Sequence, residues 1–108
     1  MRINKQVTVT AGVPVQLFDQ PIRLNRYMVQ MIHGATVGLG YVMAGIANRT
    51  PAATNAFDLT AELYPATATA PGGAFTDEDE AHGIRGDQVW LDGAVTGTKI
   101  LITADIAV

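Results

Sequence analysis

Hydrophobic and polar residues alternate along most of this chain with a period of two, the pattern of a β-strand with one buried face. The alternation is clearest at residues 99–108, where Ile100 and Ile102 begin an apolar series at every second position. Lys99, Thr103 and Asp105 stand between the members of this series. A free tail would not need such a pattern, so we expect this segment to be a structural strand of an all-β body.

Shorter segments with strand character precede this one, separated by Gly, Pro, Asn and Asp residues that favour turns. They lie at residues 5–10, 15–18, 26–32, 37–43, 57–63 and 88–93. Helical periodicity is nearly absent. The spacing predicts a single domain, residues 1–108, built as a β-sandwich or jelly-roll-like barrel of six to eight antiparallel strands.

Residues 65–86 differ from the rest of the chain because they combine Ala-Thr alternation, a Pro-Gly-Gly sequence and an acidic run. Few of them could anchor a core. We therefore expect a long surface loop here, with one helical turn capped by Thr76.

Two segments predict close packing. Residues 26–32 carry apolar side chains on both faces, which is typical of a strand that is central in the core or covered by another subunit. Gly38 and Gly40 leave one face of the next segment without side chains, so another backbone or a large side chain can approach closely.

Composition narrows the possible functions. The chain of 108 residues has no cysteine, so it offers no disulfide and no thiolate metal site. Its start shows no cleaved signal, and no apolar run is long enough to span a membrane. Only 16% of residues are charged, with a net charge of −3. A surface this poor in charge favours an oligomer or a protein docked on a partner.

The candidate chemical groups are sparse. Residues 77–80 form the run Asp-Glu-Asp-Glu, followed by His82, but their spacing does not fit a calcium-binding loop. A solvated acidic run and a docking patch for a basic partner both remain open. His33 and His82 each precede a glycine and are expected in turns. Serine is absent as well as cysteine, so we predict no enzyme activity, no metal and no cofactor.

Aromatic residues allow two interpretations. Trp90, Tyr27, Tyr41 and Tyr64 could form a stacking platform for a sugar or a base. The first three lie within apolar strand segments, which favours core or interface packing instead.

The order of motifs provides a resemblance. The chain opens with VTVTAGVPVQL at residues 7–17 and Pro-Ile-Arg at residues 21–23, and closes with VWLDGAVTGTKI at residues 89–100. With GLGYVMAG at residues 38–45 between them, it resembles the small β-rich structural proteins of tailed bacteriophages. Residues 52–86 depart from that pattern because they are longer and richer in Ala and Thr than the short turn of the family.

The resemblance implies a non-enzymatic virion protein of the capsid decoration, or cement, type. Such a protein binds the major capsid protein on the outer surface of the phage head, as a homotrimer, without binding nucleic acid or membrane. The basic start of the chain and its two-sided strand predict the interface: Arg2, Lys5, Arg23, Arg26, Tyr27, Met28 and Ile32. The alternatives are a tail, baseplate or head-fibre component and a carbohydrate-binding β-sandwich.

Overall fold

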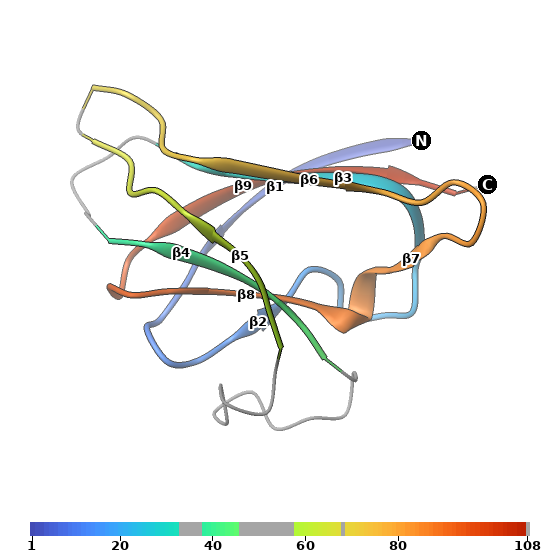
Figure 1. Ribbon diagram of the computed structural model, residues 1–108, viewed down its shortest axis with the longest axis horizontal. Helices are drawn as coiled ribbons and strands as arrows, with labels where there is room; N and C mark the ends of the chain where they lie inside the picture. The colour runs from blue at the N-terminus through green and yellow to red at the C-terminus, as the bar shows by residue number, and fades with distance from the viewer. Residues whose placement is uncertain (33–37, 46–57, 68, 108) are drawn as a thin grey trace.

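The structure, a computed structural model, describes residues 1–32, 38–45, 58–67 and 69–107. Within these residues nine strands form two sheets, and every strand pair is antiparallel (Figure 1). The larger sheet has the order β1 (Arg2–Thr8), β9 (Lys99–Ile106), β3 (Arg23–Met31) and β6 (Ala74–Glu78), and β7 (Ile84–Arg85) also pairs with β3. The smaller sheet has the order β2 (Val15–Gln16), β8 (Val89–Gly93), β4 (Gly40–Ala44) and β5 (Asp58–Leu63).

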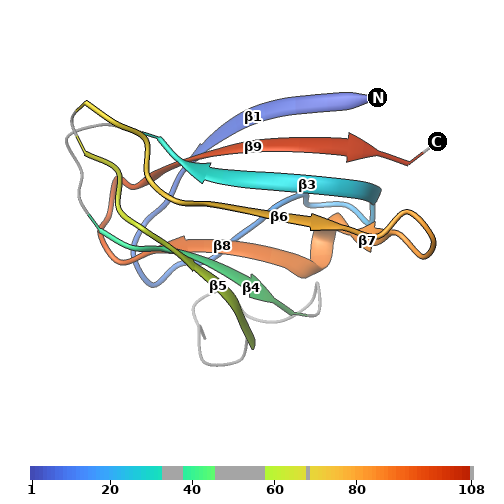
Figure 2. The ribbon, with the colours of Figure 1, turned by 45° about the horizontal axis from the view of Figure 1, so that its top comes forward.

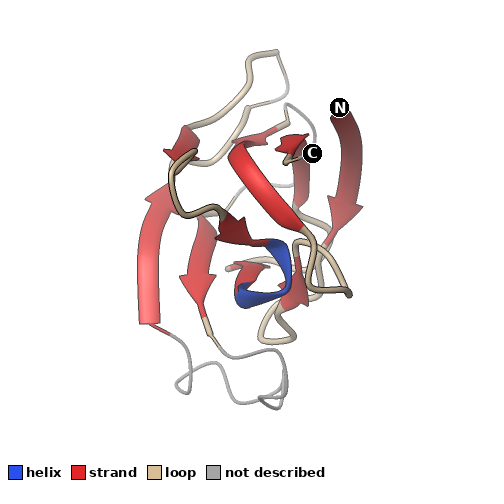
Figure 3. Cartoon of the chain, turned by 90° about the vertical axis from the view of Figure 1, so that its right-hand side faces the viewer, coloured by secondary structure: helices blue, strands red, loops and turns tan. Residues whose placement is uncertain are grey.

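The two sheets lie over each other and enclose the core, which confirms the predicted all-β sandwich (Figures 2 and 3). A short 3-10 helix, η2 (Gly86–Gln88), leads from β7 into β8. Apolar side chains from both sheets form one cluster, whose fully buried members include Leu17, Leu24, Val29, Val42, Leu91, Ile100 and Ile102. Most of the strands therefore contribute an inner apolar face to this cluster.

Strand β9 lies between β1 and β3, so the predicted structural strand at residues 99–108 is confirmed for residues 99–106. Ile100, Ile102 and Ala104 are completely buried, whereas Lys99 is exposed and Thr103 is half-buried on the opposite face. A central strand contributes one face to the core and bonds to neighbours along both edges.

Strand β3 is likewise central. Its residues Tyr27, Val29 and Met31 are buried in the core, and Met28 is half-buried on the outer face. The predicted close approach at Gly40 is confirmed, because a Cβ atom there would lie 2.5 Å from the sulfur of Met31.

The predicted long loop at residues 65–86 is wrong in part, because it contains β6 and β7. Thr76 does not cap a helical turn but pairs with Met28 inside β6. The strand was hidden because one of its inward positions is occupied by Asp77, which interrupts the apolar alternation beside Phe75.

The gap between the two sheets is closed at one end and open at the other along the side of β5 and β6. At the closed end Gly73 donates its N–H to the carbonyl of Tyr64 (3.1 Å) and accepts the N–H of Met31 (3.0 Å). From there β5 diverges from β6 (Figure 1). Beyond that point Asp77 of β6 and Ile84 of β7 line a pocket between the sheets.

Candidate interaction surface

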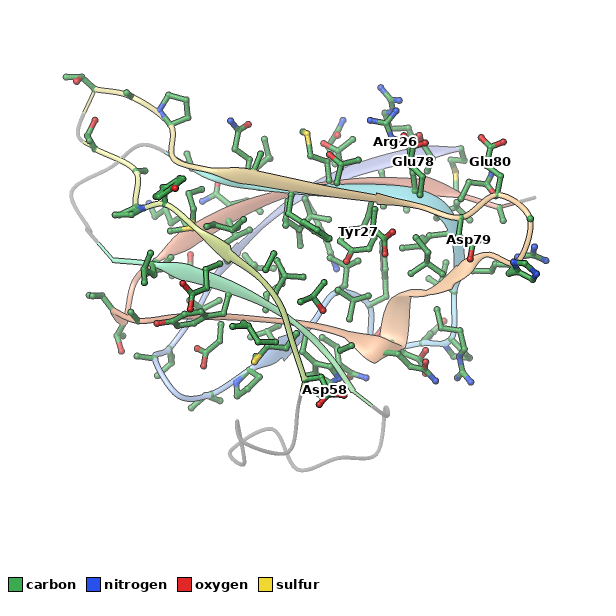
Figure 4. The ribbon with its side chains drawn as sticks, viewed as in Figure 1. Arg26, Tyr27, Asp58, Glu78, Asp79 and Glu80 are labelled. Carbon is green, nitrogen blue, oxygen red and sulfur yellow. The ribbon has the colours of Figure 1, made fainter. Side chains whose placement is uncertain are left out.

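The residues of the predicted interface do not share one face. Figure 4 shows Arg26 with Glu78 on the outer side of the large sheet, while Tyr27 lies between the sheets. Cross-strand register places Arg2 and Met28 on the same outer face as Arg26. Tyr27 is only 2% exposed, so its ring packs in the core and offers little surface to a partner.

A ladder of alternating charges crosses four strands at one end of the outer face. The register aligns Arg2, Asp105, Arg26 and Glu78, one from each of β1, β9, β3 and β6. Arg2 Nε lies 2.9 Å from Asp105 Oδ1, and Arg26 Nε lies 3.9 Å from Asp105 Oδ2 and 3.8 Å from Glu78 Oε1. The basic end predicted from the first quarter of the chain is thus partly neutralised by acids from its second half.

The ladder shifts the ionisation of its members. The hydrogen bond from Arg2 holds the pKa of the Asp105 carboxyl below its ordinary value, and the charges of Arg2 and Arg26 act in the same direction. The same contact raises the pKa of the Arg2 guanidinium. Because these groups are exposed, the pairs fix the geometry of the face more than they stabilise the fold.

Beside the ladder lie two rows of side chains that carry no formal charge. One row aligns Asn4, Thr103, Met28 and Thr76, and the next aligns Gln6, Leu101, Gln30 and Ala74. All eight residues are exposed or half-buried. Beyond the second row lies the charged Lys99, which pairs with Thr8 at the end of β1. The outer face is therefore an uncharged, partly apolar field bounded by charge at both ends.

Lys5 belongs to the inner side of β1, not to the outer face. Its partner in β9 is the buried Ile102, and its ammonium group lies 4.3 Å from the ring centre of Phe18. Burial lowers the pKa of Lys5, and nearby Asp19 opposes this shift. An inward-facing lysine on an edge strand discourages pairing with another strand, so it protects the β1 edge.

Arg23 lies at the start of β3 and supports the turn between β6 and β7. Its guanidinium donates to the carbonyl of Ala81 (3.4 Å), and Gly83, with a φ of 79°, leaves room for the arginine side chain. Ile32 follows β3 and donates its N–H to the carbonyl of Lys99 (3.2 Å). Both residues border the outer face, so they remain candidates for its rim.

The acidic run divides among three environments. Asp77 pairs with Tyr27 on the inner face, Glu78 lies beside Arg26, and Asp79 accepts the N–H of His82 (3.0 Å) in the turn. The side chains of the acidic run therefore do not converge on one site. Among the described residues no group of three or more His, Asp or Glu side chains could hold a metal ion, and His33 lies outside those residues.

The aromatic residues do not form the exposed platform that a sugar-binding site would need. Trp90 is 3% exposed and packs with Met43 and the partly buried Tyr41 in a second cluster. Tyr64 is 79% exposed but belongs to the closed end of the gap between the sheets. Packing is therefore the role that the structure supports for Trp90 and Tyr27.

Two buried acids were not predicted from the sequence. Asp87 accepts two hydrogen bonds from Arg85, at 3.1 and 2.8 Å, and its backbone carbonyl accepts one from Gln16 (2.9 Å). Asp92 accepts the backbone N–H groups of Gly12 (3.2 Å) and Gly93 (2.8 Å). The spacing of Arg85 and Asp87, two positions apart around a glycine, was the available signal for the first pair.

A cavity of about 280 Å³ lies at the open end between the sheets. Its walls come from β3, β4, β5, β6, the start of β8 and the segment that joins β6 to β8. Its polar members are Tyr27, Thr60, Asp77, Arg85 and Gln88. Burial, reinforced by the negative charge of Asp77, raises the pKa of the Tyr27 phenol. The cavity faces away from the outer side of the large sheet.

Comparison of the chain with protein-family models, with curated proteins and with solved structures found no match. In the part of the chain that the structure describes, no helix has the length and apolar character needed to cross a membrane.

Proposed function

We propose that this chain is a non-enzymatic structural protein of a phage virion, which binds the major capsid protein and stabilises the outside of the head. The motif order described above supplies the class of protein. We place the docking surface on the outer face of the large sheet, and the pattern of charged and uncharged side chains there supports this choice.

One observation carries the choice of surface. The two central rows of the outer face contain Asn, Gln, Thr, Ala, Met and Leu side chains and no charged group, whereas charges stand at both ends. Interface centres are depleted in charged residues, and their rims are polar. The outer face has the same arrangement, with an uncharged centre and charged residues at its ends.

The contact made by one copy is expected to be weak, because the uncharged part of the face consists of only two rows of side chains. We propose that three copies act together, so that the second and third contacts form within an already bound assembly. The charge content of 16% supports association of this kind. Light scattering measures the oligomer directly, and a mass of one chain would contradict the trimer.

Co-sedimentation with shells assembled from the capsid protein of the same genome tests the function. The protein should sediment with the shells and raise the temperature at which they open. Reversing the charges at Arg23 and Arg26 should weaken binding and change its dependence on salt. Unchanged binding and salt dependence would remove these residues from the interface. Failure of the unmodified protein to bind would contradict the decoration role.

The alternative of a tail, baseplate or head-fibre component shares this surface and differs in the partner. Cryo-electron microscopy of the virion distinguishes the two by the position of the density. The carbohydrate-binding alternative has less support, because Trp90 and Tyr27 are buried.

A further inference from the structure

The cavity at the open end between the sheets has the size of a binding site for one small group. Its volume of about 280 Å³ lies near the lower end of the range for ligand sites. At about 30 Å³ for each water molecule in the liquid, this space suits a short chain of heavy atoms. Ile84 and Val89 contribute an apolar part to the wall.

The charges around the cavity favour a cation. Arg85 is already paired with the buried Asp87, with a distance of 2.8 Å between Nη2 and Oδ2. Arg23 packs against Gly83 of the wall, but its guanidinium donates to the carbonyl of Ala81. Among the described residues no salt bridge joins Asp77 to a cation. The Tyr27 phenol, directly opposite Asp77 in the register, stays neutral because burial and Asp77 both raise its pKa. One negative charge is therefore left uncompensated beside an apolar wall.

We propose that this cavity binds an alkylammonium or alkylguanidinium group, with the Asp77 carboxylate as its counter-ion. The alkyl chain packs against Ile84 and Val89, and the Tyr27 hydroxyl and the Thr60 side chain offer oxygen acceptors near the cation. A carboxylate and a cation together form the stronger class of hydrogen bond, which is enhanced where water is partly excluded.

Of the acidic run, Glu78 lies beside Arg26 on the outer face and Asp79 accepts the N–H of His82 in the turn. Asp77 is therefore the member of the run that lines the cavity. The site lies on the inner side of the sheet, so the inference does not depend on the proposed docking of the outer face.

Titration followed by NMR of the labelled protein tests the proposal. The probes are n-butylammonium and n-butylguanidinium. The neutral control is n-butanol, and the anionic control is butyrate. The cations should shift resonances of Tyr27, Asp77 and Ile84, and n-butanol should bind at least about tenfold more weakly. Equal binding of n-butanol and the cations, or no shift at these residues, would overturn the proposal.

Two sources share this ligand chemistry: a free amine and a lysine or arginine side chain of a partner. An extended peptide with blocked ends, whose single charged residue is an arginine, is compared with n-butylguanidinium to separate them. Tighter binding of the peptide assigns the site to a partner protein, and tighter binding of the free cation assigns it to a small molecule. Binding of neither contradicts the site.

Matched variants separate this site from general electrostatic attraction. Asp77→Asn and Glu80→Gln each remove one negative charge from the same run. Asp77→Asn should weaken cation binding roughly tenfold or more, and Glu80→Gln less than about twofold. Equal losses in both variants would show that only the local field acts. Thr60→Phe, at an exposed position of β5, should block the cavity while Asp77 stays in place, and unchanged binding in this variant would also overturn the proposal.

Discussion

The two faces of the large sheet are built from the same strands but follow different physical rules. On the inner face of β3 and β9, Val29, Ile100 and Ile102 are fully buried in a core shared with the small sheet. On the outer face, Met28 and Leu101 remain half-exposed among uncharged polar neighbours. The inner face thus stabilises the monomer, whereas the outer face keeps partly apolar surface available for another molecule.

The difference shows that strand propensity and alternation alone do not distinguish a core face from a docking face. Strand β3 carries Met28 on its outer face and Val29 on its inner face, and the second sheet covers only the inner one.

The largest effect is expected from shortening a side chain of the inner face. Ile102→Ala should lower the free energy of unfolding by about 2–5 kcal/mol, because it leaves a cavity in a closely packed core. Leu101→Ala, one residue away on the outer face, should cost less than about 1 kcal/mol. Denaturant unfolding of the two variants measures both values. Equal costs would mean that the outer face is packed within the monomer.

The closed end of the inner face should be sensitive to added volume. A Cβ atom at Gly72 would collide with the carbonyl oxygen of Tyr64 and lie 2.7 Å from the Cβ of Met31. Gly72→Ala should therefore destabilise the protein by about 1–3 kcal/mol. Thermal unfolding checks the loss, and a variant as stable as the parent would show that the two sheets are not joined tightly there.

Ionisation should also distinguish the inner face. The phenol of Tyr27 has a raised pKa, so the folded state favours the neutral form more than the unfolded state does. Its contribution to stability is complete below the ordinary pKa of 10.0 and is lost as the pH rises above that value. Phenolate absorbance of the parent protein, compared with Tyr27→Phe, should show no ionisation of Tyr27 near pH 10. Ionisation at that pH would place the ring in contact with water.

The smallest effect is expected at the charge ladder of the outer face. The pKa of Asp105 lies below its ordinary value of 3.8, so the ladder contributes to stability above that pH and loses its contribution as the pH falls below it. Arg2→Ala should raise the pKa of Asp105 while hardly changing stability near neutral pH. Carboxyl NMR shifts follow the titration. An unchanged pKa of Asp105 would mean that its contact with Arg2 does not persist in solution.

Much of the fold could be predicted from the sequence because most strands bury one apolar face. The alternation at residues 99–106 identified β9, and the two glycines of residues 38–40 correctly indicated close packing. Strand β6 was missed because Asp77 occupies an inward position, where the pattern calls for an apolar residue. An inward carboxylate at the edge of a cavity is a local exception that periodicity does not detect.

The candidate surface was harder to predict because it depends on register between distant strands. Arg2 and Asp105 are 103 positions apart in sequence yet form a hydrogen bond. The basic residues of the first quarter were grouped by sequence, but register sends Lys5 inward and Arg2 outward. The cavity was hard to predict for the same reason, because its walls come from strands of both sheets that are distant in sequence.

Shell binding by one pair of variants tests most directly whether the outer face of the large sheet is the docking surface. Met28→Glu adds a negative charge to the uncharged rows, and Leu59→Glu adds the same charge to β5, where Leu59 is 56% exposed. Co-sedimentation with capsid shells should show that Met28→Glu no longer binds while Leu59→Glu binds like the parent protein. Equal binding by the two variants, or loss of binding only in Leu59→Glu, would contradict the account.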